Sequence, residues 1–175
     1  MTGRVRDATA ADAAACAAIY APYVLETAIT FEAEPPDEVE MGGRIAASLA
    51  RHAWLVIEDD DGRVFGFAYG TEHKTRAAYR WSCDVSIYLE VGRRRTGAGR
   101  ALYEALLPRL AQRGYVTAVA GMTLPNEASA GLHRAMGFKP IGIYHRIGYK
   151  LGAWHDVEWL QRPLADVDGE PPEPS

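Results

Sequence analysis

The segment RRTGAG, residues 94–99, places two arginines and two glycines between a β-rich stretch and a helical pattern. Glycines let consecutive backbone N–H groups turn toward one anion, and the start of a helix adds a partial positive charge. Together with the charges of Arg94, Arg95 and Arg100, this pattern could hold a pyrophosphate. A glycine-rich turn with solvated arginines has the same composition, so the loop alone leaves both interpretations open. It matches neither the Walker loop, which ends in Gly-Lys-Ser/Thr, nor the three-glycine dinucleotide fingerprint.

Composition narrows the class of protein. The chain has 175 residues, 48% of them hydrophobic, and a formal net charge of -4, values typical of one globular domain with no nucleic-acid partner. No apolar run is long enough for a membrane span, and the N-terminal stretch does not resemble a signal peptide. Cys16 and Cys83 suggest two reduced thiols and a cytoplasmic location. His73, His145 and His155 lack metal-ligand spacing, so we expect no metal.

Hydrophobic periodicity predicts one central sheet with helices packed on it, an α/β or α+β domain over residues 1–165. Residues 166–175 are acidic and proline-rich, which favours a disordered tail. Pro22 is expected to disturb the first helix and Pro108 to kink the third. Strands are predicted at residues 4–9, 53–59, 63–70, 81–91 and 115–124, with two more in 139–164, and helices at 11–21, 37–52, 99–114 and 125–138.

The RRTGAG loop resembles the Arg/Gln-x-x-Gly-x-Gly/Ala loop of the GNAT superfamily N-acetyltransferases, and NEASAGLHRAMGF resembles their second cofactor-side helix. The segments IYAPYVLETAITFE, KTRAAYRWS, LPNEAS and GAWHDVEW are similar to phosphinothricin and methionine sulfone/sulfoximine N-acetyltransferases. This resemblance covers nearly the whole chain except the tail. It implies the GNAT fold, a mixed, mostly antiparallel sheet of about seven strands flanked by about four helices.

The resemblance also implies acetyl-CoA as the acetyl donor. Ile87, Tyr88 and Leu89 would form the strand whose backbone pairs with the pantetheine arm, and Asn126 would hold that arm from the other side. The pyrophosphate would be wrapped by the loop and the first residues of the next helix, which are Arg94, Arg95, Thr96, Gly97, Ala98, Gly99 and Arg100.

An amine attacks a thioester only as the free base, so a group must remove its proton. Asp84 matches the position where phosphinothricin acetyltransferases carry their proposed catalytic glutamate, and is one methylene shorter. Its alternative role is a structural ion pair with Arg76 or Arg80. His133 matches a helix position whose side chain is proposed to protonate the leaving thiolate, and its alternative role is a half-buried histidine bonded to a carbonyl.

The segment at residues 72–81 is cationic and aromatic. Arg76 can grip the carboxylate of an amino-acid acceptor with two hydrogen bonds, and Tyr79 could close the pocket. The resemblance suggests that Phe31 lines the acceptor site, although it could equally anchor its loop to the core. Family members are commonly homodimers, in which Trp154 and His155 would cover a neighbouring subunit's site.

The predicted activity is acetyl-CoA-dependent N-acetylation of a small amino-acid-like amine such as phosphinothricin or methionine sulfone/sulfoximine, with a possible part in antibiotic or herbicide resistance. Two alternatives remain. One is a GNAT enzyme for another amine, such as a polyamine, an aminoglycoside or a protein N-terminus. The other is a non-catalytic acyl-CoA-binding sensor, which the replacement of glutamate by Asp84 would favour.

Overall fold

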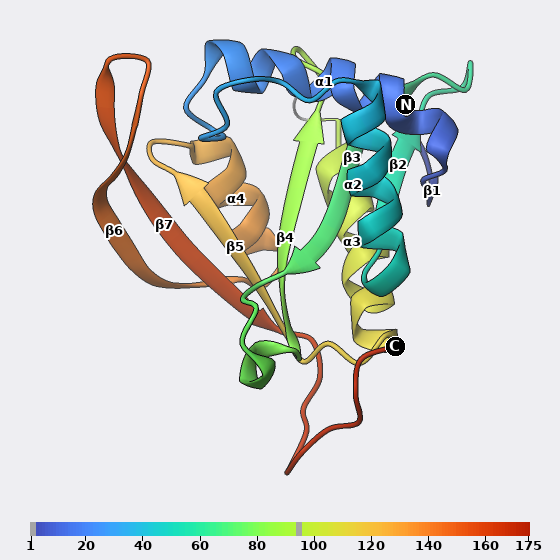
Figure 1. Ribbon diagram of the computed structural model, residues 1–175, viewed down its shortest axis with the longest axis vertical. Coiled ribbons are helices and arrows are strands. Elements are labelled where there is room, and N and C mark those ends of the chain that lie inside the picture. Colours follow the sequence, from blue (N-terminus) through green and yellow to red (C-terminus); the bar gives the residue numbers. More distant parts are fainter. Residues whose placement is uncertain (1–2, 94–95) are drawn as a thin grey trace.

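The computed structural model describes residues 3–93 and 96–175, so the expected cofactor residues Arg94 and Arg95 lie outside the described residues. Seven strands form one mixed sheet in the order β1-β2-β3-β4-β5-β7-β6 (Figure 1). The strands are β1 (Arg4–Asp7), β2 (Trp54–Glu58), β3 (Val64–Glu72), β4 (Ser82–Leu89), β5 (Thr117–Thr123), β6 (Lys139–Lys150) and β7 (Ala153–Pro163). The helices are α1 (Ala13–Glu26), α2 (Glu38–Arg51), α3 (Ala98–Gln112) and α4 (Glu127–Ala135). The expected fold class is confirmed.

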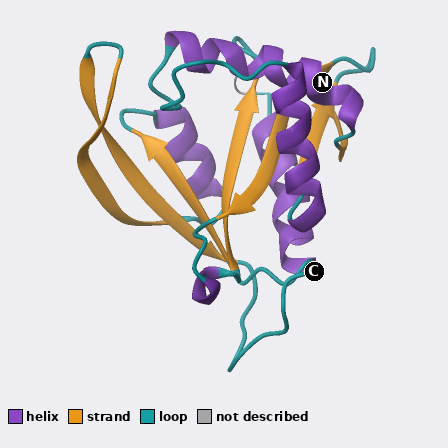
Figure 2. Ribbon diagram, in the orientation of Figure 1, coloured by secondary structure: helices purple, strands orange, loops and turns teal. Residues whose placement is uncertain are grey.

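Helices cover both faces of the sheet (Figure 2). Side chains alternate along β2, so Trp54 and Val56 join a core with α1 and α2. Leu55 and Ile57 point the other way, into a second core with α3 and α4. Both faces of the central strands are therefore buried, which explains the nearly continuous apolar run of β2.

The sheet is split between β4 and β5. β4 pairs with β3 along its length, from Cys83 to Leu89. It pairs with β5, the only parallel neighbour in the described sheet, solely from Ser82 to Asp84. Beyond Asp84 and its partner Val119 the two strands diverge, as Figure 1 shows. We call this divergence the β4–β5 fork.

Pro22 does not end the first helix, contrary to the sequence-based expectation, because α1 continues to Glu26. Tyr20 and Val24, on either side of the proline, are both buried against the sheet. Tertiary burial of this apolar stripe therefore outweighs the hydrogen bond that proline removes. α3 likewise continues through Pro108.

The C-terminal segment, residues 166–175, contains no helix or strand but contacts the domain. Trp81 Nε1 donates to the Pro172 carbonyl at 2.9 Å, and Arg80 Nε lies 2.9 Å from Glu173 Oε1. Ser175 N donates to the Arg113 carbonyl at 2.9 Å. The disorder expected of this segment stays a prediction, and these contacts show where it would rest when ordered.

Candidate functional site

Asp84 lies at the base of the fork, because it is the last residue of β4 that pairs with β5. Its Oδ1 is 2.6 Å from His73 Nδ1, so its partner is this histidine and not Arg76 or Arg80, which the structural alternative named. Arg80 instead pairs with Glu170 and Glu173 of the tail. Burial raises the pKa of the Asp84 carboxyl, while the hydrogen bond and charge of His73 act in the opposite direction.

The glycine loop leads into α3 with the geometry of an anion cradle. Gly97 is the residue before α3 and has a φ of +80°, in the left-handed region that favours glycine. Among the described residues, no atom lies within 4 Å of where a Cβ at Gly97 would be. N–H groups in the first turn of a helix lack intrahelical partners, and here they belong to Ala98, Gly99 and Arg100. The Ala98 N–H donates to Thr96 Oγ1 at 3.4 Å. Thr96 and Arg100 are exposed beside them.

The remaining expected cofactor residues border the fork. Ile87, Tyr88 and Leu89 lie on β4 beyond its pairing with β5, and pair only with β3 among the described strands. A Cβ at Gly99 would lie 3.0 Å from Leu132 and 3.5 Å from Ile87, so α3, α4 and β4 converge there. Asn126 caps α4 by accepting from Ser129 N at 3.1 Å.

His133 lies apart from Asp84. Its Nδ1 donates to the Ser129 carbonyl at 2.8 Å, and its Nε2 lies 3.1 Å from the Tyr103 hydroxyl. Burial lowers the pKa of His133, against the effect of the Ser129 hydrogen bond. Its ring contacts Phe138 in the α3–α4 core, whereas alternation along β4 directs Asp84 to the opposite face. These contacts favour the structural alternative, and the catalytic role stays a prediction.

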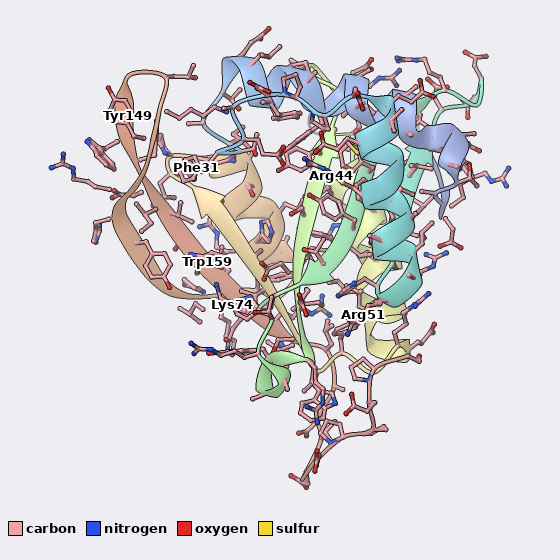
Figure 3. The ribbon with its side chains drawn as sticks, viewed as in Figure 1. Phe31, Arg44, Arg51, Lys74, Tyr149 and Trp159 are labelled. Atoms are coloured by element: carbon pink, nitrogen blue, oxygen red, sulfur yellow. The ribbon has the colours of Figure 1, made fainter. Side chains whose placement is uncertain are left out.

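The residues expected to bind the acceptor are Arg76, Tyr79 and Phe31. Arg76 is exposed, and within residues 3–93 and 96–175 its side chain makes no hydrogen bond or ion pair. The Tyr79 ring packs edge-on against His73, with centroids 5.7 Å apart. Phe31 packs over Gly148 of β6, where its ring fills the space that a side chain would need. Figure 3 shows Phe31, Trp159 and Lys74 along the side of the molecule that carries β5 and β7.

Motifs in the sequence do not identify two residues of this site, His73 and Trp159. The antiparallel pairing of Thr71 with Asp84 brings His73, the residue after β3, close to the carboxylate. Trp159 of β7 lies over Gly121 and packs edge-on against His73 at 6.3 Å. Its buried Nε1 has no hydrogen-bond partner in the described part of the chain. Strand register was the available signal for His73, and no sequence signal placed Trp159.

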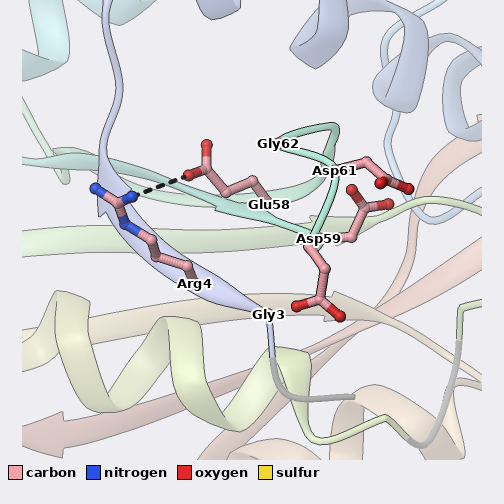
Figure 4. A pocket seen from close by; sticks show the side chains of 7 residues that line it. Gly3, Arg4, Glu58, Asp59, Asp61 and Gly62 are labelled. Carbon is pink, nitrogen blue, oxygen red and sulfur yellow. Dashed lines mark ion pairs between the residues drawn. The ribbon is translucent and has the colours of Figure 1, made fainter.

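A separate hollow lies at the β1–β2 edge of the sheet (Figure 4). Arg4 pairs with Glu58 there at 3.8 Å. None of the predicted site residues belongs to it, and its lining residues are Gly3, Arg4, Glu58, Asp59, Asp60, Asp61 and Gly62. Within the described ranges, no group of three or more His, Cys, Asp or Glu side chains could hold a metal ion. None of the described helices has the length and apolar character needed to cross a membrane.

Comparison with known proteins gives one consistent family. A model of the acetyltransferase (GNAT) domain matches residues 5–159. A phosphinothricin N-acetyltransferase of Streptomyces viridochromogenes is 37% identical over 90% of this chain and 86% of the relative. An L-methionine sulfoximine/L-methionine sulfone acetyltransferase of Pseudomonas aeruginosa is 31% identical over 98% of this chain and 100% of the relative. The crystal structure of a GNAT superfamily phosphinothricin acetyltransferase from Sinorhizobium meliloti in complex with AcCoA has a TM-score of 0.94 at 36% identity, covering 99% of this chain and 95% of that one.

Proposed function

Because this chain belongs to the GNAT acetyltransferase family, we propose that it transfers the acetyl group of acetyl-CoA to the amine of a small amino-acid-like acceptor. Phosphinothricin and methionine sulfone or sulfoximine are the acceptors suggested by the names of its relatives. The observation that carries the proposal is the fork, which has an anion cradle at its open end and a carboxylate at its base.

The residues around the fork fit acetyl-CoA. Beyond Asp84, β4 has no described strand on its β5 side, so the backbone of Ile87 and Leu89 can pair with an extended pantetheine arm. The first turn of α3 and the left-handed Gly97 offer N–H groups to a pyrophosphate. The charges of Arg94, Arg95 and Arg100 would add to this attraction.

The acceptor would bind on the face that carries Asp84. Arg76 would hold its carboxylate, with Tyr79 and Phe31 forming apolar walls. Asp84 would supply the negative charge that favours removal of the amine proton. Its burial excludes much of the water that would weaken this interaction. For the leaving thiolate, proton donation by His133 remains part of the proposal, acting from the other face of the sheet.

An acceptor screen tests this function. Thiol release from acetyl-CoA is measured with phosphinothricin, methionine sulfone, methionine sulfoximine, ordinary amino acids and a polyamine. We expect turnover with the first three, and about 100-fold less with Asp84→Asn at an unchanged acetyl-CoA KM. Turnover only with polyamines would support the other-acceptor alternative. Acetyl-CoA binding without turnover on any amine would support the sensor.

Several finer properties belong to the same proposal. We propose a homodimer, supported by the exposed apolar surface of the last two strands. A cytoplasmic location is supported by two free cysteines, Cys16 and Cys83, both buried. A part in antibiotic or herbicide resistance would follow if phosphinothricin proves to be an acceptor.

A further inference from the structure

The pairing of His73 with Asp84 carries an inference that rests on the proposed function and deepens it. We infer that His73 is the catalytic residue that takes the proton of the acceptor amine, and that Asp84 orients its ring. The two side chains come from different elements, since His73 follows β3 and Asp84 belongs to β4. Their 2.6 Å contact is the only hydrogen bond described for the His73 ring.

The contact determines which ring nitrogen can react. A carboxylate accepts from the Nδ1–H of His73, which leaves Nε2 as the unprotonated nitrogen that can receive a proton. Within the described part of the chain, Nε2 has no hydrogen-bond partner. The same division of roles lets a buried aspartate orient the histidine base of serine proteases.

The surroundings hold the ring in place beside the acceptor residues. Tyr79 and Trp159 both pack edge-on against it, with centroids 5.7 and 6.3 Å away. Only 17% of the His73 side chain is exposed, compared with 30% for Asp84. Tyr79 belongs to the segment that also carries Arg76. An acceptor held by Arg76 would therefore lie close to the imidazole of His73 as well as to the Asp84 carboxylate.

The negative charge of Asp84 favours proton transfer from the acceptor amine to His73. The charged and titratable groups around His73 are Asp84 on β4, Lys74 next in the chain and Tyr79 in the helical turn. The His73 ring becomes positively charged when Nε2 takes a proton. Although burial raises the pKa of Asp84, the ionised carboxylate beside the ring would stabilise that positive charge. An imidazole changes charge near neutral pH, whereas an aspartate ordinarily does so at about pH 4. The imidazole is therefore the better matched base for an amine at neutral pH.

The acceptor nitrogen loses two protons during the reaction. The ammonium proton of the acceptor moves to His73 Nε2, leaving a neutral amine and an imidazolium beside the Asp84 carboxylate. The amine lone pair forms the C–N bond to the acetyl carbon, and the C–S electron pair leaves on the sulfur of CoA. The second proton leaves the new amide nitrogen and ends on that sulfur. His73 then releases its proton to solvent.

His73→Asn tests the inference because the amide can still donate to Asp84 but cannot act as a base. His145→Asn is the matched control, since His145 pairs through Nδ1 with Asp156 at 2.9 Å on the exposed β6–β7 hairpin. With phosphinothricin as acceptor, we expect kcat to fall about 100-fold for His73→Asn and to stay unchanged for His145→Asn. The acetyl-CoA KM should not change in either variant, which also shows that the fold is intact.

Two further readouts separate catalysis from positioning. The acidic limb of the kcat–pH profile should disappear in His73→Asn. Added imidazole should partly restore kcat in His73→Ala. A kcat within threefold of wild type for His73→Asn, or a profile that keeps its acidic limb, would overturn the inference while the proposed function stands. A wild-type enzyme that releases no thiol with any acceptor would instead overturn the proposed function and the inference with it.

Discussion

Arg76 presents a fully charged guanidinium to solvent one residue before the short helical turn Ala77–Tyr79. Its neighbour Arg80 is used differently, because it lies over the Trp81 ring and pairs with tail carboxylates. Of these two arginines, Arg76 is therefore the one whose donors remain available to an acceptor carboxylate. This contrast could not be read from the sequence, where both are arginines in one cationic segment.

Arg76→Ala should raise the acceptor KM by about 10- to 100-fold, because hydrogen bonds to a charged group contribute about 1.5–3 kcal/mol. The acetyl-CoA KM should change little. Steady-state kinetics with each substrate varied in turn measures both constants. Arg134→Ala is the control, since it removes another exposed arginine, on α4. Equal increases in the two Michaelis constants would contradict an acceptor role for Arg76.

Asp84 can be identified from the sequence, but its hydrogen-bond partner His73 cannot. The position of Asp84 followed from a local motif, whereas its contact with His73 depends on strand register across the β3–β4 hairpin. A shift of one residue in register turns every side chain to the opposite face. Because Asp84 Oδ1 already lies 2.6 Å from His73 Nδ1, a longer side chain at this position would disturb the contact. Asp84→Glu is therefore not expected to improve the enzyme.

Among the elements, the start of α3 most directly links backbone conformation to ligand binding. Gly97 provides the left-handed turn before α3, and a Cβ there would have no described atom within 4 Å. Gly62, in the β2–β3 turn, has nearly the same φ, +78°, and a Cβ there would also have no described atom within 4 Å. A substitution would therefore meet a similar left-handed backbone at either glycine, but only Gly97 borders the fork.

Gly97→Val and Gly62→Val should each destabilise the protein by about 1–2 kcal/mol, because a side chain disfavours the left-handed conformation. Only Gly97→Val should weaken acetyl-CoA binding, since its side chain projects into the cradle. Urea unfolding measures the first effect and calorimetric titration with acetyl-CoA the second. If both variants bound acetyl-CoA equally well, the cradle would lie elsewhere.

Periodicity predicted the strands and helices because amphipathic patterns are local. Two element-scale features were not predictable in that way. α1 continues past Pro22 because the burial of Val24 compensates for the proline, and that burial depends on the sheet beneath it. The fork depends on where β4 stops pairing with β5, and the two strands are separated in sequence by the whole of α3.

For the whole molecule, the unusual surface is the β6–β7 hairpin. β6 has 12 residues and is an edge strand of the sheet, where its described partner is β7. Long edge strands with exposed apolar side chains favour pairing with another chain. The side chains concerned are Ile141, Ile143, Tyr144, Ile147, Tyr149, Leu151 and Trp154, each more than 40% exposed. A second copy of this chain would bury them.

Light scattering during size-exclusion chromatography should therefore give twice the 19.1 kDa chain mass. Replacing Ile147 and Tyr149 together by lysine should yield a monomer, because two charges would be buried in the interface. Val39→Lys is the control, since Val39 is 83% exposed on α2, outside the hairpin. A wild-type protein that elutes as a monomer at about 10 µM, within the usual affinity range of stable dimers, would contradict the homodimer.

The contacts of the last residues affect how the protein should be handled. Ser175 is held by Arg113, and the Pro172 carbonyl lies against Trp81, which immediately precedes β4. A purification tag or surface anchor joined after Ser175 would pull on the strand that carries Asp84. One joined ahead of β1 would attach beside an edge strand of the sheet, three strands from β4. N-terminal attachment is therefore the better choice for immobilising this protein without disturbing the fork.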